Sequence, residues 1–147
     1  MAINKAKASE VIDVPPEKFF KVISDFEKYP EFIPEVKGVK ILEKKKNEVT
    51  AEFEISLIKN IKYVLKLTFD PPHRLSWTLA EKGFFKQNDG AWELEPLEGG
   101  KKTKATYIVE IGVGMFVPKS IVNMLVGQSL PQMLKRFKER AESLYKK

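Results

Sequence analysis

The segment Tyr29-Pro30-Glu31-Phe32-Ile33-Pro34 divides the chain into two parts of different character. Strand-like sequence fills most of the chain after it, and a long amphipathic stretch, residues 118–146, ends the chain. A sheet that grips one helix must curve around it, and this arrangement readily leaves an apolar cavity between the two. The sequence therefore predicts a protein that holds a lipid or another small molecule, in preference to an enzyme.

The size and composition of the chain predict one globular domain, residues 1–147. Hydrophobic residues make up 43% and charged residues 31%, which allows a packed core and argues against disorder. No stretch approaches the roughly 20 apolar residues of a membrane-spanning helix, and residues 1–7 lack the apolar part of a secretory signal. Without cysteine there is no disulfide and no thiolate chemistry. We therefore expect a cytoplasmic protein, or one at the inner face of a membrane.

The first part of the chain predicts one strand and two short helices. Residues 3–13 form the strand, which ends before Pro15 and Pro16. A helix is expected over 16–24, where Pro16 fits the first turn. Asp25 is placed to cap a second short turn, which should stop before Pro30.

From Val36 onward, apolar residues alternate with polar ones, which is typical of strands with one buried face. Turn signals stand at 44–47, 70–73 and 98–101. The stretches between them are strand-like and contain no helical pattern, which predicts an antiparallel meander. The predicted strands cover about 36–41, 49–57, 61–69, 75–79, 84–96 and 105–113.

The final helix is predicted over 118–146, with a kink or break at Pro131. Its apolar stripe consists of Val126, Leu130, Met133, Leu134, Phe137, Ala141 and Leu144. Ile121, Met124 and Leu125 point away from this stripe although they are apolar. Either they meet a partner, a ligand or a bilayer, or the preceding loop or a second subunit covers them.

The net charge of +6 is concentrated at the end of the chain. Residues 119–147 hold seven Lys or Arg against two Glu, a balance of +5, so the rest of the chain is close to neutral. A basic face of this kind attracts anionic lipid, ribosomal RNA or an acidic protein. The alternative is a solvated helix face whose charges serve solubility.

The sequence offers little for catalysis, and we expect no catalytic residue and no metal site. His73 is the only histidine and lies in a predicted turn. The carboxylate pairs Glu52/Glu54 and Glu93/Glu95 alternate with core residues, so they should point to solvent. Three further carboxylates flank the Tyr29 segment, where they either line a cavity mouth or cap and solvate the turn. They are Asp25, Glu31 and Glu35.

Aromatic residues carry the prediction of a binding site, because many of them fall on inward positions of the predicted strands. The predicted ligand-binding residues are Tyr29, Phe32, Phe53, Tyr63, Trp77, Phe85, Trp92, Tyr107, Phe116, Met124 and Gln128. Among them Tyr63, Tyr107 and Gln128 are candidate donors to a polar head group. The corner at 114–125 combines apolar residues with Lys119, which suits a lid that touches a membrane.

Five motifs, in this order, resemble those of the START-like helix-grip superfamily, specifically its coenzyme Q-binding and polyketide cyclase/dehydrase branch. They are Val14-Pro15-Pro16-Glu17-Lys18-Phe19-Phe20, Asp25 to Pro34, Gly83-Phe84-Phe85-Lys86, Gly90-Ala91-Trp92-Glu93-Leu94-Glu95-Pro96 and Arg136-Phe137-Lys138-Glu139-Arg140-Ala141. The resemblance covers residues 3–145. The chain departs from the pattern at Glu35-Val36, where an aromatic or small residue and a cysteine are expected after the proline.

The resemblance implies an α+β helix-grip (START/Bet v 1-like) fold. In it a curved antiparallel sheet of six or seven strands wraps around a long C-terminal helix, with two short helices after the first strand. It also implies a hydrophobic small-molecule ligand between sheet and helix, here a quinone or isoprenoid-like lipid, and no other cofactor. Because the branch is related to a ribosome association toxin family, the alternative partner is the ribosome or its RNA. A polyketide cyclase or dehydratase is the third interpretation, and oligomeric state stays open.

Overall fold

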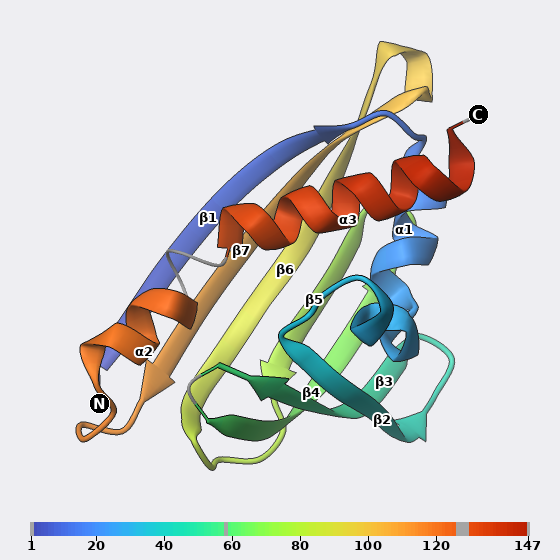
Figure 1. The fold of residues 1–147 in the computed structure, drawn as a ribbon. Coiled ribbons are helices and arrows are strands. Elements are labelled where there is room, and N and C mark those ends of the chain that lie inside the picture. Colours follow the sequence, from blue (N-terminus) through green and yellow to red (C-terminus); the bar gives the residue numbers. More distant parts are fainter. Residues whose placement is uncertain (1, 58, 126–129, 147) are drawn as a thin grey trace.

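The computed structural model describes residues 2–57, 59–125 and 130–146, and it shows a curved sheet with helices on one face (Figure 1). The strands are β1 (Ala2–Ile12), β2 (Val36–Lys44), β3 (Glu48–Ser56), β4 (Asn60–Asp70), β5 (Arg74–Leu79), β6 (Phe85–Leu97) and β7 (Lys102–Val113). The helices are α1 (Pro16–Ser24), the 3₁₀ helices η1 (Phe26–Glu31) and η2 (Glu98–Gly100), α2 (Lys119–Asn123) and α3 (Leu130–Tyr145).

The seven strands form one antiparallel sheet in the order β1-β7-β6-β5-β4-β3-β2. The meander from β2 to β7 is therefore confirmed, and β1 closes the far side by pairing with β7. Side chains on β3 alternate strictly between buried and half-buried, as one covered face requires. The pairing of β2 with β3 shifts register twice, at Val36/Gly38 and at Ile41/Glu43, and such bulges bend and twist a strand.

The helix α1 begins and ends where the sequence predicts. Its apolar face, with Phe19 and Ile23 fully buried, packs on the core. Two predictions for the next turn are wrong. Asp25 makes no capping hydrogen bond because its backbone, at φ −92° and ψ 71°, lies outside the extended region of a capping residue. The turn η1 also runs through Pro30, since the Tyr29 carbonyl accepts hydrogen bonds from the backbone N–H groups of Phe32 and Ile33.

The described residues of the C-terminal region form α2 and α3, and α3 runs through Pro131 without the predicted kink or break (Figure 1). Pro131 is the second residue of α3, and a proline in the first turn of a helix removes no internal hydrogen bond. Val126 of the predicted stripe lies outside the described residues.

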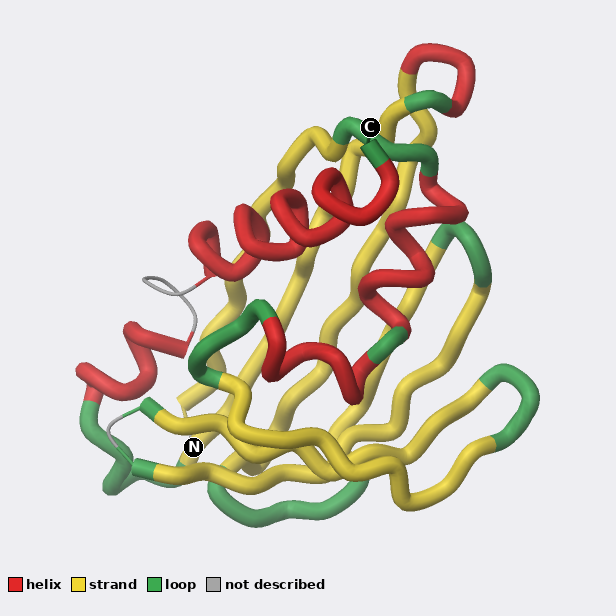
Figure 2. Tube along the Cα trace, turned by 45° about the vertical axis from the view of Figure 1, so that its right-hand side comes forward, coloured by secondary structure: helices red, strands yellow, loops and turns green. Residues whose placement is uncertain are grey.

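The apolar stripe of α3 is buried through Leu130, Leu134, Phe137 and Ala141. Leu144 is 46% exposed, which corrects its assignment to the core. At about 100° per residue, Leu144 falls at the margin of the stripe, on the same side as the half-buried Met133. Figure 2 shows α3 lying along the concave face of the sheet with α1 and η1 beside it.

The apolar residues of α2 do not form the exposed surface that their helical spacing suggested. Ile121 is 6% and its neighbour Val122 8% exposed, so both are buried within the molecule. Leu125 packs against the core and Met124 is half-buried. No helix in the described part of the chain is long and apolar enough to cross a bilayer.

Candidate functional site: a cavity between the sheet and the C-terminal helix

A cavity of about 180 Å³ lies between the concave face of the sheet and α3. Its wall contains residues of η1, of strands β2 to β7 and of α3, together with Leu125 after α2. Seven of the predicted ligand-binding residues are in this wall: Tyr29, Phe53, Tyr63, Trp77, Phe85, Trp92 and Tyr107. Six of them are on strands, where the alternation of side chains turns them toward one face; Phe85 reaches the same face as Trp92, seven residues further along β6, because the pairing with β7 shifts register between Phe85 and Gln87. Their contact with a ligand stays a prediction.

The aromatic residues of the wall pack against one another, several of them edge to face. Trp92 lies with its ring centroid 5.0 Å from those of Tyr107 and Phe137, and Tyr63 lies 5.0 Å from Phe85. Such pairs contribute about 0.5–1.5 kcal/mol beyond the burial of their area. The rings are thus held by each other, and the cavity between them has defined walls.

The position of Trp77 depends on Gly90, which the sequence did not reveal as part of the site. A Cβ atom at residue 90 would collide with the Trp77 ring and with the Ile108 carbonyl oxygen. The Trp77 indole N–H donates a hydrogen bond of 3.2 Å to the side-chain oxygen of Asn88, which is 7% exposed and also lines the cavity. Asn88 was not predicted from the sequence, because inward positions were identified by their apolar side chains and Asn88 is polar.

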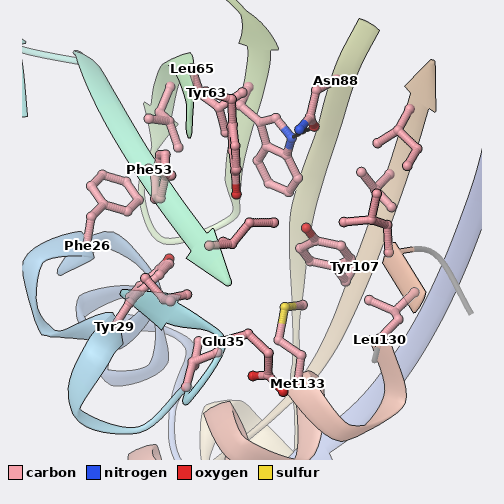
Figure 3. A pocket seen from close by; sticks show the side chains of 18 of the residues that line it. Phe26, Tyr29, Glu35, Phe53, Tyr63, Leu65, Asn88, Tyr107, Leu130 and Met133 are labelled. Atoms are coloured by element: carbon pink, nitrogen blue, oxygen red, sulfur yellow. Dashed lines mark hydrogen bonds between the residues drawn. The ribbon is translucent and has the colours of Figure 1, made fainter. Parts of the chain in front are cut away.

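The three tyrosines in the wall differ in how their hydroxyls are satisfied. Tyr29 donates to the Ile23 carbonyl, which ties η1 to α1. The hydroxyls of Tyr63 and Tyr107 have no hydrogen-bond partner among the described residues, and both turn into the cavity (Figure 3). Burial raises the pKa of Tyr63 and of Tyr107 well above the ordinary value, so both hydroxyls stay protonated. The cavity therefore contains two unused hydrogen-bond donors.

The cavity also has one charged wall residue, Glu35, which comes from the loop before β2. Its carboxylate oxygens lie 3.2 and 3.3 Å from one guanidinium nitrogen, Nη1, of Arg136 on α3. Both side chains are partly exposed, at 33% and 27%. Of the three carboxylates considered for a cavity mouth, only Glu35 lines it, since Glu31 instead pairs with Arg140 at 2.8 Å.

Three predicted residues lie outside the cavity wall, and one cannot be placed. Phe32 packs on Phe137, with ring centroids 5.1 Å apart, and lies under the Arg140 guanidinium. Phe116 is 96% exposed at the corner after β7, where no periodicity constrains a side chain. Met124 is half-buried but does not line the cavity. Gln128 lies outside the described residues.

Most cations of the terminal helix are paired with carboxylates of the same molecule, so the predicted basic face is largely neutralised. The pairs are Arg136–Glu35 at 3.2 Å, Lys138–Glu142 at 3.3 Å, Arg140–Glu31 at 2.8 Å and Lys146–Asp13 at 2.6 Å. The sum of charges could not show this, because three of these four partners come from the first 35 residues of the chain. Lys119 and Lys135 are the exposed cations of this region that form no ion pair within the described residues.

The remaining candidates for chemistry lie away from the cavity. His73 is exposed in the turn before β5, as predicted. The carboxylate of Glu93 pairs with Arg74 at 2.7 Å, and both side chains are about half exposed. Within the described residues, no group of three or more His, Asp or Glu side chains could hold a metal ion.

A sheet of seven antiparallel strands, folded around a C-terminal helix with an apolar cavity between them, defines a START/Bet v 1-like helix-grip protein. Residues 12–138 match the family described as polyketide cyclase / dehydrase and lipid transport, and the chain belongs to that family. The description of the family covers an enzymatic class as well as lipid transport.

Comparison with individual proteins agrees with this assignment. The chain is 25% identical over 138 residues to the ribosome association toxin RatA of Pseudomonas aeruginosa, covering 93% of this chain and 94% of that protein. The solved structure of TTHA0849 from Thermus thermophilus superimposes with a TM-score of 0.85 at 18% identity, covering 97% and 99% of the two chains. A START superfamily protein from Mycobacterium smegmatis gives 0.82 at 20% identity, covering 95% and 98%. At these identities the two structures establish the fold alone.

Proposed function

We propose that this protein binds a hydrophobic ring compound in the cavity, a quinone or isoprenoid-like lipid, and carries it without making or breaking bonds. The observation that supports this most directly is that the hydroxyls of Tyr63 and Tyr107, which have no hydrogen-bond partner among the described residues, face a largely apolar cavity. Both side chains are half-buried, and the described residues contain no fully buried polar side-chain atom without a partner, so the two hydroxyls are donors that remain accessible from the cavity and that an acceptor on a ligand can use. The two carbonyl oxygens of a quinone are acceptors of the required kind.

The volume of the cavity limits which part of such a ligand it takes. Ligand sites are commonly about 300–1,000 Å³, and an apolar cavity of about 150 Å³ takes up benzene. A space of 180 Å³ therefore accepts one substituted ring. An isoprenoid tail would have to leave the cavity, and Glu35, which contacts both cavity and solvent, marks a place where the wall reaches the surface.

The chemistry of the wall supports a carrier more than a cyclase or dehydratase. Bond-making chemistry of that kind needs a general base poised near neutral pH. Burial raises the pKa of Tyr63 and of Tyr107, so both stay protonated at neutral pH and neither is available as a general base, although both remain hydrogen-bond donors. The one carboxylate in the wall, Glu35, is engaged by Arg136.

The test is titration with ubiquinone-1, whose short tail keeps it soluble, followed by tryptophan fluorescence. The only two tryptophans of the chain, Trp77 and Trp92, both line the cavity, so a bound quinone should quench nearly all emission. The double variant Tyr63→Phe/Tyr107→Phe should bind about ten-fold or more weakly, because it lacks two hydrogen bonds of about 1 kcal/mol each. Tyr145→Phe, an exposed position on α3, is the matched control. Unsaturated linear quenching, or equal affinity in both variants, would contradict the proposal.

We further propose that the corner between β7 and α2 contacts an anionic membrane while ligand is exchanged, at the inner membrane face. Met115 is 78% and Phe116 96% exposed there, next to the exposed Lys119. Exposed apolar side chains beside a cation suit the boundary between lipid head groups and acyl chains. Phe116→Asp should abolish flotation with phosphatidylglycerol vesicles, while Leu42→Asp, an exposed apolar position on β2, should not. Equal flotation of the Phe116 variant and the unsubstituted protein would exclude this contact.

A role at the ribosome is the second candidate, and it rests on the similarity to a ribosome association toxin. The ion pairs on α3 remove most of the charge that would have bound RNA phosphates. Co-sedimentation with ribosomal subunits at 50 and 200 mM salt separates the two candidates. Binding that weakens steeply with salt would favour the ribosome, since neutralising phosphates releases counterions. Uptake of ubiquinone-1 into an apolar cavity should hardly change over the same range.

A further inference from the structure

Glu35 gives the cavity a hydrogen-bond acceptor on the side opposite to the hydroxyl donors of Tyr63 and Tyr107. The tyrosine hydroxyls enter from β4 and β7 of the sheet, and the Glu35 carboxylate reaches the cavity from the side of η1 and α3, next to Met133 (Figure 3). Among the described residues of the wall, every other one is apolar, aromatic or, in Asn88, an uncharged amide. The cavity thus has a donor end and an acceptor end.

The geometry of the ion pair leaves the carboxylate able to accept more. A bidentate arginine uses two nitrogens, one for each oxygen, in two parallel hydrogen bonds. Here a single nitrogen of Arg136 is shared between both oxygens at 3.2 and 3.3 Å, so most of the roughly four lone-pair sites of the carboxylate are unused. No other hydrogen bond to the Glu35 side chain exists among the described residues.

The backbone of Glu35 is fixed, so the carboxylate has a defined place. Its carbonyl accepts a 2.7 Å hydrogen bond from the Ser56 N–H at the end of β3, and the next residue, Val36, donates to the Ile33 carbonyl at 3.0 Å. Arg136 anchors the side chain to α3 from the other direction. An acceptor that is held in advance loses little entropy when a ligand binds it.

We infer that Glu35 is a specificity-determining residue that accepts a hydrogen bond from a hydroxyl of the bound ligand, with Arg136 as its positioning residue. The ligand class that fits is a ring compound with an acceptor oxygen at one end, facing Tyr63 and Tyr107, and a hydroxyl at the other. This inference rests on the proposed function and deepens it. For a quinone-type ligand it means that the reduced, hydroxyl-bearing form binds more tightly than the oxidised form, whose carbonyl oxygen would face the carboxylate.

The test compares two probes of nearly equal shape by isothermal titration calorimetry. 4-Hydroxyacetophenone has a carbonyl acceptor and a hydroxyl, whereas 4-methylacetophenone has a methyl group in place of the hydroxyl. The measured quantity is the ratio of their affinities. Because a hydrogen bond to a charged group is stronger than one to a neutral group by about 1 kcal/mol, Glu35→Gln should lower this ratio about five-fold. It should leave the affinity for 4-methylacetophenone within about two-fold.

Two further variants make the result specific. Glu31→Gln breaks the neighbouring ion pair with Arg140 but lies outside the cavity, so it should leave the ratio unchanged. Glu35→Asp retains the charge and shortens the side chain by one methylene, and it should lower the ratio in the same direction. If Glu35→Gln does not fold, Glu35→Asp therefore still tests whether Glu35 recognises the ligand hydroxyl.

The outcomes separate this inference from the proposed function. If both acetophenones and ubiquinone-1 bind, and the affinity ratio is the same in all variants, Glu35 only supports the structure and the inference is wrong. If 4-methylacetophenone binds more tightly once Glu35 is replaced, the ion pair closes the cavity and takes no part in recognition, which also overturns it. If none of the three compounds binds the unsubstituted protein, the proposed function is wrong, and the inference about Glu35 is wrong with it because it rests on that function.

Discussion

Replacing Tyr29 with phenylalanine should destabilise the fold, whereas the same replacement at Tyr63 or Tyr107 should not, because the substitution removes the same hydroxyl from different surroundings. At Tyr29 the hydroxyl donates to the Ile23 carbonyl between η1 and α1. At Tyr63 and Tyr107 it faces the cavity without a partner among the described residues. The ring and its packing are retained in all three variants.

The expected magnitudes follow from these surroundings. Tyr29→Phe leaves a buried carbonyl unsatisfied and should lower the free energy of unfolding by about 1–3 kcal/mol. Since roughly 2–4 °C of melting temperature corresponds to 1 kcal/mol in a chain of this size, its Tm should fall by about 2–12 °C. Tyr63→Phe and Tyr107→Phe remove a half-buried hydroxyl that has no hydrogen-bond partner among the described residues. Each should change the free energy of unfolding by less than about 0.5 kcal/mol or increase it.

Urea unfolding of the ligand-free protein, followed by circular dichroism, measures all three values under one condition. Circular dichroism is preferable to fluorescence here, because Trp77 and Trp92 would report the altered cavity directly. A loss of about 1 kcal/mol or more in Tyr63→Phe or Tyr107→Phe would mean that its hydroxyl is already satisfied in the empty protein. The argument for a ligand acceptor would then lose its basis, whatever the result at Tyr29.

Two further substitutions test the site and the termini. Gly90→Ala should lower the free energy of unfolding by about 1–3 kcal/mol, because the added methyl meets the Trp77 ring and a fixed backbone carbonyl. Gly83→Ala, with open space at its Cβ, is the control in the same urea titration, and equal losses at both sites would refute the packing argument. The hydrogen bond from Lys146 lowers the pKa of Asp13 below its ordinary value of 3.8. The pair therefore stabilises the fold at pH values above 3.8, and this stabilisation is lost as the pH falls through the lowered pKa. Asp13→Asn should therefore flatten the dependence of Tm on pH below about pH 4, slightly, because the pair is exposed and screened by salt. Parallel Tm–pH curves for the two proteins would show that the pair contributes nothing.

The strands and most of the cavity wall could be predicted because alternation reports directly which face of a sheet a residue is on. Phe53, Tyr63, Trp77 and Tyr107 all lie on the inward register, and the structure places all four in the wall. Phe116 was predicted from its hydrophobicity alone. It lies in the corner after β7, outside any strand or helix, so no periodicity indicates which way its side chain points. Hydrophobicity alone does not distinguish a wall residue from an exposed tip.

The charged parts of the site could not be predicted, because their partners are remote in the chain. Arg136 and Glu35 are 101 residues apart, and Arg140 and Glu31 are 109 apart. A sum over residues 119–147 therefore predicted a basic surface, where the fold instead uses those cations to fasten α3 to η1 and β1. The unusual Glu35 could be seen as a departure from the family motif, but its place in the cavity wall could not.

The presence of the cavity itself supports a ligand, because a protein that binds none would be more stable if larger side chains filled the space. At about 24 cal/mol for each Å³, an enclosed and dry space of 180 Å³ would correspond to about 4 kcal/mol of unrealised stability, which is an upper bound here because the wall reaches solvent at Glu35. That is a large fraction of the roughly 5–15 kcal/mol by which domains are usually stable. The means to close it are available, since the wall already contains Val109, Ile111 and Leu65, where one larger side chain would occupy the space. Such a cost is tolerated where function needs the opening, and it is recovered when a ring enters the cavity and meets the free hydroxyls of Tyr63 and Tyr107.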